Sequence, residues 1–133
     1  MEKNLLSDEL DAREKSEYLR GLLVVMAADG DVHDLEKATI RRVIEPFGFS
    51  PDYIEECMAD ILKNAHVSHA APVFRNRQHA LSFLCDALSI AFADGEMHMA
   101  EQSWLATAAA ANGIATEWLD AQLAGTQGIA PIQ

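Results

Sequence analysis

Apolar residues recur at spacings of three and four along most of the chain, which is the period of an amphipathic α-helix. In the first such segment they are Tyr18, Leu19, Leu22, Leu23 and Met26. No segment shows sustained alternation of apolar and polar residues, so no strand is expected. The pattern predicts an all-α protein, a single-domain helical bundle of about six to seven helices.

Capping and breaking residues set the expected helix boundaries. A second helix is predicted from near Asp34 to a stop at Gly48, with Pro46 distorting its last turn. A third is predicted to open at Ser50-Pro51, with serine as N-cap and proline at the first helical position. The later apolar segments predict three further helices, at about 77–93, 99–112 and 116–124.

The second half of the chain repeats the first at a shift of 65 positions without a gap. The identical pairs are Leu19/Leu84, Leu23/Leu88, Ala28/Ala93, Asp29/Asp94, Gly30/Gly95, His33/His98, Glu36/Glu101 and Gly48/Gly113. Because the matches centre on polar residues, duplication is the simplest explanation. We expect two pseudo-symmetric three-helix repeats at about 16–62 and 77–124, with a connector at 64–76 and a tail at 125–133.

Each repeat carries the motif Asp-Gly-acid-x-His-x-x-Glu between its first two helices. Its ionisable members are Asp29, Asp31, His33 and Glu36, then Asp94, Glu96, His98 and Glu101. One interpretation is purely structural. The glycine ends a helix, and the glutamate at the third position of the next helix reaches back to backbone N–H groups, as in a capping box. On this interpretation the motif only shapes a helix corner.

The other interpretation is a cation site. Asp29 and Asp94 are expected at helix C-termini, where a carboxylate meets the negative end of the helix dipole unless a cation lies nearby. His33 and His98 take the expected N-cap positions, which Ser, Thr, Asp or Asn usually occupy. Two or three carboxylates with an imidazole suit Mn²⁺, Fe²⁺ or Zn²⁺, and carboxylates alone suit Ca²⁺ or Mg²⁺. All eight residues are therefore candidate ligands of a divalent cation, whose identity the sequence leaves open.

The charge balance narrows the classes of partner. The chain has 21 acidic and 10 basic residues and a formal charge of -11. Because phosphate contacts require clustered Lys and Arg, no nucleic-acid partner is expected. The longest apolar run, residues 22–28, is too short to span a bilayer, and no basic leader precedes an apolar run at the N-terminus. We therefore expect no membrane insertion and a cytoplasmic location.

Catalytic motifs are missing from the sequence. It contains no nucleophile elbow, phosphate loop, dinucleotide fingerprint or zinc-protease helix, so an enzyme is not expected. Trp104 is a candidate for a protein-partner or homodimer interface, because its counterpart Thr39 suggests an outward position. Burial against the other repeat is the alternative for Trp104. Cys57 and Cys85 are expected to be reduced and buried.

At these residues the sequence resembles the TerB-like tellurite-resistance family, which includes the N-terminal domain of the DjlA type of co-chaperone. The resemblance spans roughly residues 15–124 and rests on Ala28-Asp29-Gly30-Asp31 with Glu36, and on Ala93-Asp94-Gly95-Glu96 with Glu101. It implies a helical bundle with pseudo-two-fold halves, whose clustered acidic residues are thought to bind metal ions in stress-response or membrane-associated complexes.

The residues that match the family motif are Asp29, Asp31, Glu36, Asp94, Glu96 and Glu101. His33 and His98 depart from the small or acidic residues that the family would place there, which leaves the metal preference open. Two functions follow as hypotheses. The first is a non-enzymatic TerB-like module that binds a divalent cation at both corners, in a stress-response or accessory role. The alternative is a metal-free interaction or scaffold domain whose motifs only cap helices.

Overall fold

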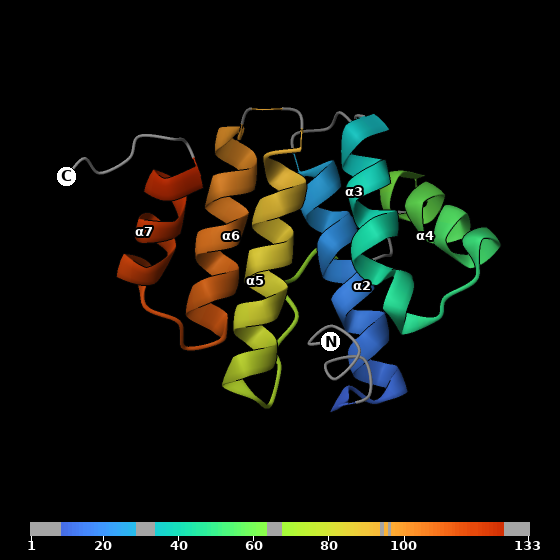
Figure 1. Cartoon of the computed structure of the whole chain (residues 1–133), viewed down its shortest axis with the longest axis horizontal. Helices are drawn as coiled ribbons and strands as arrows, with labels where there is room; N and C mark the ends of the chain where they lie inside the picture. The colour runs from blue at the N-terminus through green and yellow to red at the C-terminus, as the bar shows by residue number, and fades with distance from the viewer. Residues whose placement is uncertain (1–8, 29–33, 64–67, 94, 96, 127–133) are drawn as a thin grey trace.

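The computed structural model describes residues 9–28, 34–63, 68–93, 95 and 97–126. Its helices are α2 (Ala12–Ala27), α3 (Asp34–Ile44), α4 (Pro51–Lys63), α5 (Arg77–Ala91), α6 (Met99–Ala111) and α7 (Thr116–Thr126), and a 3-10 turn, η1 (Glu45–Phe47), follows α3. No strand occurs among these described residues. The all-α prediction is confirmed (Figure 1).

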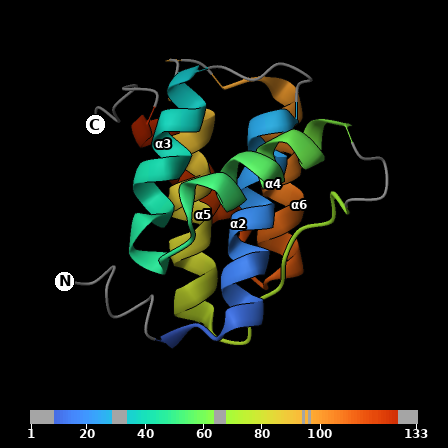
Figure 2. The same ribbon diagram turned by 90° about the vertical axis from the view of Figure 1, so that its right-hand side faces the viewer.

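α2 lies at the centre of the bundle because it is apolar nearly all round. Every residue from Gly21 to Met26 is buried. A helix of this kind requires neighbours on all sides, and α3, α4, α5 and α6 all pack against it. α5 runs beside α2 in the same direction, and α7 packs on the outer side of α6 (Figure 1). Figure 2 shows α4 lying across α2.

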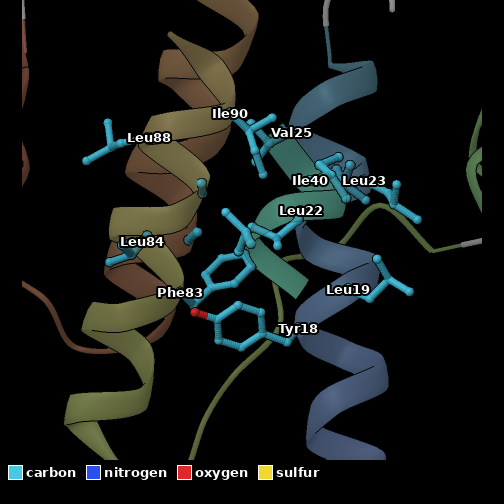
Figure 3. Close-up of a cluster of buried hydrophobic side chains, with 14 of the residues drawn as sticks. Tyr18, Leu19, Leu22, Leu23, Val25, Ile40, Phe83, Leu84, Leu88 and Ile90 are labelled. Carbon is cyan, nitrogen blue, oxygen red and sulfur yellow. The ribbon is translucent and has the colours of Figure 1, made fainter. Parts of the chain in front are cut away.

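Tyr18 joins α2 to α5 at the centre of the core (Figure 3). Its ring packs edge-to-face against Phe47, Phe74 and Phe83, with ring centroids 5.0, 5.7 and 5.3 Å away. Its hydroxyl donates a hydrogen bond to Asp86 Oδ2 at 2.6 Å. Burial, reinforced by the Asp86 carboxylate, raises the pKa of Tyr18. The phenol therefore stays protonated and keeps its donor role in the core.

Local sequence signals place several helix ends correctly. Ser50 Oγ accepts a hydrogen bond from the Tyr53 N–H at 3.1 Å, and Pro51 is the first residue of α4. Pro46 lies in η1, where α3 tightens into a 3-10 turn. Gly48 ends that turn in the left-handed conformation, with φ +84°. These features confirm the predicted boundary between the second and third helices.

The first helix begins at Ala12, before the expected start of the first repeat at about residue 16. Asp11 is its N-cap: Asp11 Oδ1 accepts from the Glu14 N–H at 2.8 Å, and Glu14 Oε1 accepts from the Asp11 N–H at 3.4 Å. This is a complete capping box. The signal was present in the sequence as an acidic cap followed three residues later by glutamate.

The connector between α4 and α5 is fastened to both halves of the bundle. Asn112, at the end of α6, accepts a hydrogen bond from the Phe74 N–H and donates one to the Pro72 carbonyl, both at 2.9 Å. Arg20 on α2 donates to the Ser68 carbonyl at 2.8 Å. The described part of the connector, residues 68–76, is thus held by side chains from α2 and from α6.

The two-repeat organisation stays a prediction. Gly48 and Gly113, which the repeat pairs, both have positive φ, +84° and +70°. The third helices of the two units differ in their surroundings, because α4 packs on α2 whereas α7 packs on α6. The division into one domain with repeats, connector and tail likewise remains an expectation from the sequence. Within the described residues, no helix combines the length and hydrophobicity needed to cross a bilayer.

Gly21 marks a close approach between α2, α5 and the connector. A Cβ atom at this position would lie 2.6 Å from Phe83 Cζ and 2.8 Å from Pro72 Cγ. Both distances are far inside van der Waals contact. Any larger side chain would therefore push the Phe83 ring and the connector outward.

We expect Gly21→Ala to lower the free energy of unfolding by about 1–3 kcal/mol through overpacking. The expected change in stability is opposite in sign to the effect of helix propensity, which favours alanine over glycine by about 1 kcal/mol at an open helix site. Denaturant unfolding measures the difference. Gln102→Ala on the exposed side of α6 is the control, expected within about 0.5 kcal/mol of wild type. Wild-type stability in Gly21→Ala would contradict the close approach.

Candidate functional site

The helix ends that flank the two acidic motifs in the sequence lie at one end of the bundle. α2 and α5 run in the same direction, so their C-terminal ends lie together (Figure 1). α3 and α6 begin at that same end. We call this region the corner end: the last turns of α2 and α5 and the first turns of α3 and α6. The fold therefore brings together two segments that are 65 positions apart in the sequence.

Three of the eight candidate ligands fall within the described residues: Glu36, His98 and Glu101. The other five candidates lie outside them: Asp29, Asp31, His33, Asp94 and Glu96. The geometry below therefore concerns the first turns of α3 and α6.

Glu101 caps the start of α6. It is the third residue of the helix and its exposed fraction is 0%. Its Oε1 accepts a hydrogen bond from the backbone N–H of His98, the N-cap residue, at 3.0 Å. Burying a carboxylate is costly unless hydrogen bonds compensate, and here the N–H group and the positive end of the helix provide that compensation. The capping geometry predicted for this motif is confirmed.

Glu36 occupies the same place in α3. It is the third residue of that helix, and its exposed fraction is also 0%. Both glutamates therefore lie beneath the corner end, not on its surface. A fully buried carboxylate is not freely available to a cation in solvent.

The second corner turns at Gly95 and is closed by Met97. Gly95 has φ +93°, and its N–H donates to the Phe92 carbonyl at 2.9 Å. Met97 is half-buried and packs against the core. Met99, in contrast, is 83% exposed. The chain thus makes a tight, glycine-dependent turn between α5 and α6.

The motif's donor set matches a divalent cation in its chemistry, since carboxylates with an imidazole are ligands for Mn²⁺, Zn²⁺ and related ions. Among the residues that the structure describes, no three His, Cys, Asp or Glu side chains come together as a metal site. Glu101 Oε1 already accepts the His98 N–H. The candidates at 29, 31, 33, 94 and 96 lie outside the described residues, so a cation site formed by the motifs stays a prediction.

Trp104 has partners within the chain. Its side chain is half-buried, and its ring packs edge-to-face on Phe83 with centroids 6.2 Å apart. Its Nε1–H donates to the His69 carbonyl at 2.9 Å. The indole therefore fastens the connector to α6. Its role as a partner interface stays a prediction.

The structure contains a groove between α2 and α4 that the sequence did not predict. The groove has a volume of about 230 Å³, and its lining includes Leu19 and Leu23 from α2 and Tyr53, Cys57 and Ile61 from α4. Its lining is split between two helices that cross, so no single sequence motif marks it. Both cysteines are free, as expected. The expectation of burial is wrong for Cys85, which is exposed, while Cys57 is half-buried in the groove.

We expect Glu101→Ala to destabilise the fold by about 1–3 kcal/mol, because the partly buried His98 N–H loses its acceptor. Glu101→Gln keeps an amide oxygen at the same place and is expected to cost less than Glu101→Ala. Thermal or denaturant unfolding of the purified variants gives the order of their stabilities. Glu117→Ala removes an exposed glutamate from the first turn of α7 and serves as the control. Equal stability of Glu101→Ala and Glu117→Ala would rule out the capping contribution.

Comparison with known proteins identifies one family. No curated protein and no solved structure gives a significant match to the chain. The family model described as "Tellurite resistance protein TerB" matches residues 4–59. That segment contains α2, α3, the first acidic motif and most of α4. The resemblance seen in the sequence is therefore confirmed over residues 4–59, where the chain is similar to the TerB family.

Proposed function

We propose that this protein is a non-catalytic TerB-like module that binds a divalent cation at the corner end. The observation that carries the proposal is the parallel course of α2 and α5, which brings the ends of both motif-bearing helices together (Figure 1). On this proposal, the acidic residues that follow α2 and α5 in the sequence concentrate negative charge at this end of a chain whose net charge is -11. A divalent cation is the simplest ligand that would relieve it.

In this proposal the residues of each motif have separate tasks. Glu36 and Glu101 fix the starts of α3 and α6 from below, where both are fully buried. Asp29, Asp31, Asp94 and Glu96 supply the carboxylates, and His33 and His98 are the candidate imidazole ligands. Bound there, a cation would neutralise carboxylates that otherwise meet the negative ends of helix dipoles.

Thermal unfolding of chelator-treated protein tests the proposal, with Ca²⁺, Mg²⁺, Mn²⁺ and Zn²⁺ added one at a time. A cation at about 100 times its dissociation constant should add roughly 2.7 kcal/mol per site, which raises Tm by roughly 5–10 °C. Asp29→Ala/Asp94→Ala should lose this shift. In chelator the variant should be as stable as wild type or more stable, by about 0.3–1 kcal/mol per site, because it lacks an acid at each helix C-terminus.

Asp52→Ala/Glu117→Ala is the matched control. It also removes two carboxylates, from the exposed first turns of α4 and α7, and should keep the full cation-induced shift. A shift lost equally in both double variants would indicate general screening by the cation. No shift for any ion in wild type would overturn the proposal.

A metal-free interaction or scaffold domain is the second candidate. It is favoured by the hydrogen bond from the His98 N–H to Glu101, because this bond gives one motif a structural role that requires no ion. On this proposal, chelator leaves Tm unchanged, and Glu101→Ala destabilises the protein equally with and without added cations. A cation-induced shift that depends on Asp29 and Asp94 would exclude it.

A further inference from the structure

The groove between α2 and α4 is a separate feature from the corner end. Its α2 wall comes from residues 16–23, in the middle of the helix, whereas the corner end holds the last turn of α2. Leu19, Leu23 and Ile61 form an apolar floor. Tyr53, 40% exposed, stands at the rim and stacks on Phe49 with centroids 5.3 Å apart. α4 crosses α2 in Figure 2, which leaves this groove along their junction.

The charged residues that line the groove carry more negative than positive charge. Arg20 is the basic residue among the lining residues that the structure describes. Its guanidinium is fully engaged: it contacts Glu17 Oε1 at 2.7 Å and donates to the carbonyls of Ser68 and Ala70 at 2.8 and 2.7 Å. Asp60, on the opposite wall, is exposed. The groove thus offers an apolar floor beside a carboxylate that solvent can reach.

The chemistry of Cys57 is consistent with this negative potential. Burial in the groove raises the pKa of its thiol, and the carboxylates of Asp60 and Glu56 raise it further. These two carboxylates therefore act on the interior of the groove as well as on its outer edge. A cationic group placed at this rim would meet an attractive potential.

We propose that the groove is a docking site for a partner protein, which inserts an apolar side chain against Leu19, Leu23 and Ile61 and sets an adjacent Lys or Arg against Asp60. Charge complementarity selects this occupant. A second copy of the chain, an anionic membrane and a nucleic acid all carry the same sign of charge as this protein, whose net charge is -11.

The size of the groove agrees with an anchoring site. Its volume of about 230 Å³ lies below the roughly 300–1,000 Å³ of pockets that enclose drug-sized ligands. It suits one or two side chains of a segment that continues over the surface. Aromatic, aliphatic and arginine anchors of this kind dominate the energetics of protein interfaces.

The two free thiols allow a direct test. The probe is a synthetic amphipathic peptide of leucine and lysine, and its control has glutamate at each lysine position. Both are added to the full chain in chelator, so the result does not depend on the cation proposal. Iodoacetamide labelling followed by mass spectrometry then reports each cysteine. The lysine peptide should slow the labelling of Cys57 and leave Cys85, which is exposed on α5, unchanged.

Charge reversal identifies the site. Asp60→Lys should raise the Kd of the lysine peptide about three- to tenfold. Asp120→Lys on α7 makes the same change in net charge away from the groove and should alter the Kd much less. The unfolding of each variant is measured alongside, so that a folding defect is recognised.

Four results would overturn the proposal: no binding of the lysine peptide, equal binding of both peptides, equal loss in Asp60→Lys and Asp120→Lys, or binding that leaves Cys57 unprotected. Sedimentation of the free protein gives a fifth test. Concentration-dependent dimerisation that protects Cys57 would assign the groove to a second copy instead. None of these results bears on cation binding at the corner end, which is measured by the metal-dependent Tm.

Discussion

The fold depends on the enclosure of α2. A helix that is buried from Gly21 through Met26 presents apolar groups in every direction, so it cannot lie on a surface. α3, α4, α5 and α6 are each needed to cover part of it. The same requirement explains the small residue at 21, since the Phe83 ring and the connector reach the helix backbone there. It also explains why the phenol of Tyr18 must find a partner, Asp86, inside the bundle.

The sequence predicts well those features that are decided within a few residues. The 3-10 turn at Pro46, the left-handed Gly48 and the Ser50-Pro51 helix start are all local, and each appears where the pattern places it. The capping role of Glu101 is local in the same sense, because its partner is only three residues away. Helix periodicity gave the all-α class for the same reason.

Features that depend on which helix faces meet could not be predicted. The α2–α4 groove arises from a crossing of two helices, and neither apolar stripe alone reveals it. Trp104 turns toward Phe83 and the His69 carbonyl, contacts that the comparison with Thr39 does not indicate. The placement of the C-terminal ends of α2 and α5 at one end of the bundle required the direction of α5 relative to α2, which periodicity does not encode.

Complete burial is shared by the two glutamates that end the acidic motifs. Glu36 and Glu101 lie where solvent does not reach, so they behave as parts of the backbone framework. Substitutions at these two positions would therefore act on the stability of the whole bundle.

The fastening of the connector has a consequence for how the protein opens. Arg20 holds it from α2, while Trp104 and Asn112 hold it from α6. A fluctuation that separates α2, α3 and α4 from α5, α6 and α7 must break these hydrogen bonds together with the α2–α5 contacts. It would also expose apolar surface that neither half can cover alone. The halves are therefore coupled into one cooperative unit, in which amides of α2 and α5 should exchange with solvent mainly through global unfolding.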